Sequence, residues 1–164
     1  MIGAGVDEAL ALLPAPLDSL KARVMLLAIG WQESLFKHRC QVLQDGSRGP
    51  AHGFWQFERG GGCTGVLRHA ASRYWMHHIC GIRGVAPVPM ALWKAIEYDD
   101  TLAAAAARLL LFTDPKRLPE IGDQAGAWNL YIRVWRPGKP HPSKWQKNYA
   151  NAVDFVATPK EPLI

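Results

Sequence analysis

The sequence has no long apolar run, no repeat and no low-complexity linker, and these absences narrow the class of protein. Among its 164 residues, no apolar segment approaches the length of roughly 20 residues that a membrane-spanning helix needs. Hydrophobic residues make up 49% and charged residues 20%, the composition of a globular protein. We therefore expect one domain over residues 1–164, without stable membrane insertion. Its core should cover residues 17–157, with a short tail at each end.

Cysteine is scarce, and its odd number excludes a disulfide framework that uses every thiol. The three residues are Cys40, Cys63 and Cys80. This usage favours folding in a reducing cytoplasm, and a disulfide between two of the three is the less favoured alternative. A basic n-region is also lacking, and the apolar stretch Ala9–Leu13 ends at Pro14, so no signal peptide is expected.

Cysteine and histidine gather in one segment but lack the paired spacings that indicate zinc. No metal site and no cofactor are predicted from them. They are more consistent with surface histidines and buried thiols. One alternative stays open, because a cysteine that opens a helix after Gly60–Gly62 could be a nucleophile activated by a distant histidine. The residues concerned are Cys63, His69, His77, His78 and Cys80.

Acidic residues are outnumbered, with 14 Asp and Glu against 19 Lys and Arg, a formal charge of +5 and a pI near 9.3. Such a charge favours polyanionic partners, among them nucleic acid, anionic lipid and the bacterial wall. No run of five basic residues and no alternating basic and aromatic stripe is present, however. Nucleic acid is therefore the less favoured partner.

Most of the chain has helical periodicity. A helix should begin after the N-cap residue Ser19, because apolar residues follow at core spacing, namely Leu20, Val24, Leu27 and Trp31. Further helices are predicted over residues 64–79, 89–97, 99–112, 122–134 and 143–157, of which 99–112 should be central and buried. Residues 39–59 lack this period and should form a small hairpin or extended loops. We predict a mainly α fold, with helices around a substrate cleft and one small β element.

The apolar face of the first of these helices ends in an acid. Met25, Leu26, Ile29 and Glu33 share one side at helical spacing. Partial burial raises the pKa of a carboxyl group, which can then hold a proton near neutrality and deliver it to a leaving group. The aromatic and amide-bearing stretch Gly53–Glu58 is suited to gripping a sugar. Together they suggest cleavage of a glycosidic bond, the alternative being a helix glutamate in a salt bridge.

The run Gln32-Glu33-Ser34-x-Phe36, followed by the stretch from Ser47 to Gln56, resembles motifs of the superfamily of soluble lytic transglycosylases and goose-type lysozymes. Four motifs are collinear over residues 20–155, together with a late tyrosine. They differ from the family pattern at Pro50, which replaces glycine, at Trp128, which replaces tyrosine, and at Leu130-Tyr131, which replaces Ala-Gly. The matching elements are Gln32-Glu33-Ser34-x-Phe36, the stretch from Ser47 through Pro50-Ala51 to Gly53-Phe54-Trp55-Gln56, the Ala-rich segment Ala103–Leu111, Ala127-Trp128-Asn129, and Tyr149.

This resemblance implies a lysozyme-like fold and cleavage of the MurNAc–GlcNAc β-1,4 bond of peptidoglycan, with Glu33 as catalytic acid and base. A lytic transglycosylase is favoured over a hydrolysing muramidase, because no second carboxylate lies in a motif. Glu58 is the better candidate for such a group, ahead of Asp45. A small catalytic unit of this kind resembles a phage or prophage lysin. It would act as a monomer after release through a holin or delivery by a virion.

Six residues are predicted to bind the glycan, each with a structural alternative. Trp55 and Trp128 would line the cleft and stack on sugar rings, although most tryptophans are core residues. The hydroxyl of Ser47 would contact the acid or an acetamido group, or only complete a turn. Gln56 would present its amide, or end a strand. Asn129 should be buried and bonded to substrate or to another helix. Tyr149 would reach the acid or pack in the core.

Two rivals from other classes remain. A catalytically silent wall-binding or virion structural module could keep the same fold. A small basic nucleic-acid-binding protein would show steep salt dependence.

Overall fold

The computed structural model describes residues 2–158, and its architecture follows the helical pattern of the sequence. Helices dominate, and one three-stranded antiparallel sheet is the only β element of this part of the chain. The prediction of a mainly α fold with a small β element is confirmed. No helix among the described residues is both long and apolar enough to cross a membrane.

Two helices organise the core. The first, α2, spans Leu20–Ser34 and begins where the hydroxyl of Ser19 accepts a hydrogen bond from the Ala22 amide at 3.1 Å. The second, α6, spans Asp100–Phe112 and is capped in the same way by Asp99, which accepts from the Leu102 amide at 2.9 Å. Buried residues occupy α6 on all sides, as predicted. Its alanines let neighbouring helices approach closely.

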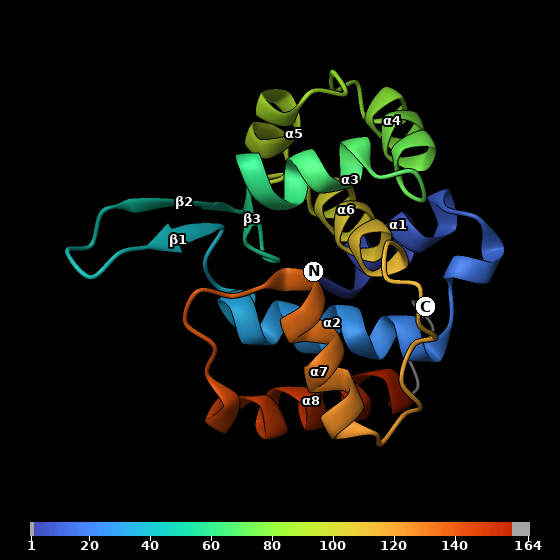
Figure 1. The fold of residues 1–164 in the computed structure, drawn as a ribbon, viewed down its shortest axis with the longest axis vertical. Coiled ribbons are helices and arrows are strands. Elements are labelled where there is room, and N and C mark those ends of the chain that lie inside the picture. Colours follow the sequence, from blue (N-terminus) through green and yellow to red (C-terminus); the bar gives the residue numbers. More distant parts are fainter. Residues whose placement is uncertain (1, 159–164) are drawn as a thin grey trace, which may run out of the picture.

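The other helices pack around these two (Figure 1). The C-terminal helix α8 lies along α2, and α1 lies along α6. The short helices α3, α4 and α5 gather at one end of the molecule, and α2, α7 and α8 form the opposite end. Their bounds are α1 Ile2–Leu12, α3 Thr64–Arg68, α4 Arg73–Ile82, α5 Pro89–Ala95, α7 Gln124–Trp135 and α8 Pro142–Ala157, with short helical turns at Ala15–Leu17 and Arg59–Cys63.

The prediction that the N-terminal residues form a tail outside the core is wrong, because residues 2–12 form a helix that contributes to the core. Val6, Ala9 and Leu10 of α1 are buried, and the side of the helix that carries Gly5 meets Asp100 of α6. The apolar stretch that ends at Pro14 is therefore a core segment.

The single helix predicted over residues 64–79 is also wrong. It divides into α3 and α4, because His69 adopts an extended conformation after α3. The turn is stabilised by Ser72, whose buried hydroxyl donates to the Val66 carbonyl at 2.8 Å. A polar side chain that satisfies a backbone carbonyl in this way competes with helix continuation.

Residues 39–59 form the sheet, in the order β1 (Cys40–Val42), β2 (Arg48–His52) and β3 (Phe57–Glu58). Cys40 pairs with His52 and Val42 with Arg48, and the register shifts between these pairs. The β1–β2 hairpin extends away from the helices (Figure 1). β3 leads back into the body of the protein.

Candidate active site around Glu33

Glu33 lies in the last turn of α2, at the point where the chain turns toward the sheet. The helix ends because Leu35 and Phe36 adopt left-handed backbone conformations, with φ of 53° and 52°. The buried hydroxyl of Ser34 donates to the Phe54 carbonyl at 2.8 Å and accepts from the Phe36 amide at 3.1 Å. Ser34 thus joins the end of α2 to the segment after β2, and fixes the backbone beside the acid.

The Glu33 side chain is partly buried, and burial raises its pKa from 4.5 to about 7. The hydroxyl of Tyr131 donates to its Oε1 at 2.6 Å, which stabilises the carboxylate and opposes this rise in pKa. The salt bridges formed by residues 2–158 do not include Glu33. The alternative of an ion-paired helix glutamate is therefore wrong. The group is suited to hold a proton near neutrality.

Tyr131 belongs to this site although its sequence context does not predict it. It lies on α7, 98 residues after Glu33, and only 2% of its surface is exposed. Its ring stacks on Trp145 of α8, with centroids 5.3 Å apart and planes 7° apart. One signal was available, because a tyrosine on the buried side of a helix needs a partner for its hydroxyl. The partner itself could not be identified from the sequence.

Trp55 does not line a cleft, so that prediction is wrong. Its side chain is 2% exposed, and its Nε1 donates to the Leu26 carbonyl of α2 at 2.8 Å. Phe54 is buried as well, edge-on to Phe36. Both sides of this short segment meet the protein, because Ser34 draws it against the end of α2.

Gln56 and Ser47 make local contacts that fit their structural alternatives. Gln56 has a left-handed φ of 54°, and its Nε2 donates to the Gly53 carbonyl at 2.9 Å within the turn before β3. Ser47 is exposed near the tip of the hairpin, where its amide and hydroxyl both donate to Asp45. A contact between Ser47 and the acid is not among the hydrogen bonds of the described residues. Sugar contacts by either residue stay predictions.

The three predicted residues on α7 and α8 have different environments. Trp128 is half-buried and packs against Tyr131 and Trp145, with centroids 5.4 and 5.5 Å apart, so it lies beside the partner of the acid. Asn129 is exposed, and the prediction of a buried amide is wrong because it faces away from the core side of α7. Tyr149 is buried and its hydroxyl accepts from the Gly122 amide at 2.9 Å, in agreement with its structural alternative.

None of the hydrogen bonds among the described residues links a second carboxylate to Glu33. Glu58 is exposed on β3. Asp45 accepts from Ser47 in the exposed hairpin turn, which lowers its pKa. The assignment of Glu58 as a water-activating group stays a prediction.

The alternative of a catalytic cysteine nucleophile is wrong. Cys63 and Cys80 are buried, and burial raises their pKa values to about 12 and about 11, so both remain thiols. All three cysteines are free, so the disulfide alternative is not realised. Within residues 2–158, His, Cys, Asp and Glu side chains form no group of three or more that could hold a metal ion.

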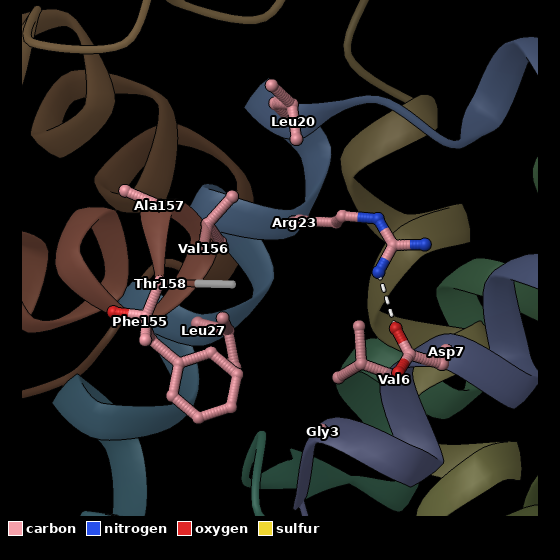
Figure 2. A pocket seen from close by; sticks show the side chains of 10 residues that line it. All are labelled: Gly3, Val6, Asp7, Leu20, Arg23, Leu27, Phe155, Val156, Ala157 and Thr158. Atoms are coloured by element: carbon pink, nitrogen blue, oxygen red, sulfur yellow. Dashed lines mark hydrogen bonds and ion pairs between the residues drawn. The ribbon is translucent and has the colours of Figure 1, made fainter. Parts of the chain in front are cut away.

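Glu33 lines neither of two hollows in the described part of the chain. One, of about 310 Å³, lies between α1, the start of α2 and the end of α8, and the ion pair of Arg23 with Asp7 borders it (Figure 2). The other, of about 430 Å³, lies on α4. The substrate cleft beside Glu33 stays a prediction. No family model, curated protein or solved structure matches the chain in the three comparisons with known proteins.

Proposed function

We propose that the protein is a peptidoglycan lytic transglycosylase that cleaves the MurNAc–GlcNAc β-1,4 bond with Glu33 as its acid and base. The observation that carries the proposal is the state of Glu33, a partly buried carboxyl with a pKa near 7 and one hydrogen bond, from Tyr131. Its place in a motif like that of lytic transglycosylases agrees with this chemistry. A phage or prophage lysis system is the proposed setting, with release through a holin or delivery by a virion.

The proposed reaction uses the same carboxyl twice. Protonated Glu33 donates its proton to the glycosidic oxygen, and the bond from that oxygen to C1 of MurNAc breaks with its electron pair on the leaving sugar. The resulting carboxylate then takes the proton of the MurNAc C6 hydroxyl, whose oxygen bonds to C1 and closes a 1,6-anhydro ring. Water is not consumed. Tyr131 occupies Oε1 and stabilises the carboxylate between the two steps.

A hydrolysing muramidase is the alternative that shares this acid. It would use water in place of the C6 hydroxyl and needs a group that activates the water, for which Glu58 is the candidate. Glu58 is exposed on β3, and the two carboxyl groups of such an enzyme lie about 5–10 Å apart, so the distance between Glu58 and Glu33 separates the two mechanisms.

A silent wall-binding or virion structural module is the rival without catalysis. It gives no reason for a proton donor at the end of α2. It predicts that Glu33→Gln leaves every activity of the protein unchanged.

The test is digestion of purified peptidoglycan followed by mass spectrometry of the soluble muropeptides. Wild-type protein should release muramyl ends one water lighter than hydrolysis products, and Glu33→Gln should release almost none while keeping its fold. Reducing muramyl ends would instead establish the muramidase and direct attention to Glu58. Absence of glycan cleavage by the wild type would overturn the proposal.

A further inference from the structure

The positive charge of the protein is concentrated in one segment. Residues 59–96 contain five of the 19 Lys and Arg residues and none of the 14 Asp and Glu residues, so the rest of the chain has 14 of each sign. The whole formal charge of +5 therefore belongs to this segment. It forms α3, α4 and α5, which lie together at one end of the molecule (Figure 1).

Two arginines of this segment are free for an external partner. Arg68 ends α3 and Arg73 begins α4, so they flank the turn between the helices, and both are exposed. In the part of the chain that the structure describes, neither takes part in a salt bridge. Arg83, in contrast, is neutralised by Asp99 at 2.8 Å.

The outer side of α4 adds aromatic and apolar surface to this charge. Arg73, Tyr74, His77 and His78 line a hollow of about 430 Å³. Tyr74 is 70% exposed, and Ile82, which follows His78 by one turn on the same side, is 50% exposed. The opposite side of α4 is anchored in the core through Met76, Ile79 and Cys80. The outer side is therefore a fixed surface. Its contacts come from α3 and α4 themselves, because His77 is hydrogen-bonded to the Leu67 carbonyl at 3.3 Å and the rings of Tyr74 and His78 pack edge-on against Trp75.

From these observations we infer that the face formed by Arg68, Arg73, Tyr74, His77, His78 and Ile82 docks on the surface of an anionic phospholipid membrane. Arginines there meet phosphate headgroups, and each basic side chain near such a surface raises affinity by a factor of about five. The tyrosine and the isoleucine fit the boundary between headgroups and acyl chains, where aromatic side chains with a polar end are enriched. A soluble polyanion offers phosphate but no apolar phase for these two residues.

This docking does not depend on the proposed cleavage of peptidoglycan, since Glu33 lies at the end of α2 and contributes nothing to the face. It would hold the enzyme at the membrane surface, next to the innermost glycan layer.

Co-sedimentation with vesicles tests the inference. Full-length protein should bind vesicles of phosphatidylcholine with phosphatidylglycerol and should not bind phosphatidylcholine alone. The double change Arg68→Ala with Arg73→Ala should weaken binding by about 25-fold, from the factor of about five for each arginine. Tyr74→Ala should weaken it further at unchanged charge. Glu33→Gln should bind like the wild type, which separates this result from the test of catalysis.

A matched control removes two lysines from the other end of the molecule. Lys139→Ala with Lys144→Ala changes the net charge equally, and both lysines are exposed. This control should retain most of the vesicle binding. Equal losses in the two double variants would overturn the inference, because attraction would then depend on net charge alone. Failure to bind anionic vesicles, with or without retention on a lipid-free polyphosphate, would also overturn it.

Discussion

At the scale of single residues, Glu33 is subject to two opposing influences. Burial favours its protonated form, while the hydrogen bond from Tyr131 favours its carboxylate. Burial is the larger effect, so the pKa stays near 7. The same pair also raises the pKa of Tyr131, because burial and the adjacent carboxyl group disfavour a phenolate. Tyr131 is therefore a permanent donor to Glu33.

The pH dependence of cleavage should report this balance. Because the proton donor is the protonated form, kcat/KM of the wild type should fall as pH rises through about 7. Tyr131→Phe removes the bond that lowers the pKa of Glu33, so the fall should move to higher pH. A purely structural role of Tyr131 would instead reduce the rate at all pH values without moving the profile. Turbidity assays of wall digestion across pH measure both.

Stability should depend on the same group. The pKa of Glu33 is about 7 in the folded protein and 4.5 ordinarily, so the folded state binds more protons between these values. The resulting contribution is fully present below pH 4.5 and is lost as pH rises through about 7, a loss of about 3 kcal/mol. The glutamine of Glu33→Gln does not titrate, so this variant does not lose that stability as pH rises. Its free energy of unfolding, relative to that of wild type, should therefore be higher at pH 8 than at pH 4.

Denaturant unfolding of both proteins at the two pH values measures the difference. Equal pH dependence in wild type and variant would contradict the raised pKa of Glu33.

At the scale of elements, the end of α2 depends on an aromatic cluster. The ring of Phe36 folds back over Gly30 and packs edge-on to Trp31, Phe54 and Trp55, with centroids 5.4 to 5.6 Å away. A Cβ at Gly30 would lie 2.1 Å from Phe36 Cζ. Residue 30 is thus a glycine because the Phe36 ring approaches its Cα closely, and not because its backbone conformation requires glycine.

Two glycine substitutions in helices should have opposite effects. Gly30→Ala should destabilise the protein by about 1–3 kcal/mol, because the buried ring of Phe36 must move. Gly81→Ala on α4 is the matched control, since nothing lies within 4 Å of its added Cβ, and it should stabilise by about 0.8 kcal/mol through helix propensity. Thermal unfolding of both variants measures the contrast. Stabilisation by Gly30→Ala would contradict the packing of Phe36.

Local signals predicted most elements well. The caps at Ser19 and Asp99 place α2 and α6 correctly, and the predicted segments 89–97, 122–134 and 143–157 correspond to α5, α7 and α8. The break between α3 and α4 was missed. It depends on Ser72 reaching a backbone carbonyl six residues away, which periodicity does not report.

At the scale of the whole molecule, charge should govern the approach to an anionic wall. Attraction between exposed charges weakens as salt shortens the screening length, so the initial rate of wall lysis should fall as ionic strength rises. Initial turbidity loss in increasing sodium chloride measures this effect, with sucrose of equal osmolality as the control. A rate that stays flat from low to moderate salt would contradict it.

The sequence by itself determined the helices, the acid on an apolar face and the excess of positive charge. These properties depend on residues close together in the chain or on composition. Only the tertiary structure decided that Tyr131 donates to Glu33, that Trp55 is buried beneath α2, and that Cys63 and Cys80 are inert thiols. Each of these depends on how α7, the sheet or α4 packs against the rest of the core. Such packing brings together side chains as far as 98 residues apart, and no local pattern encodes it.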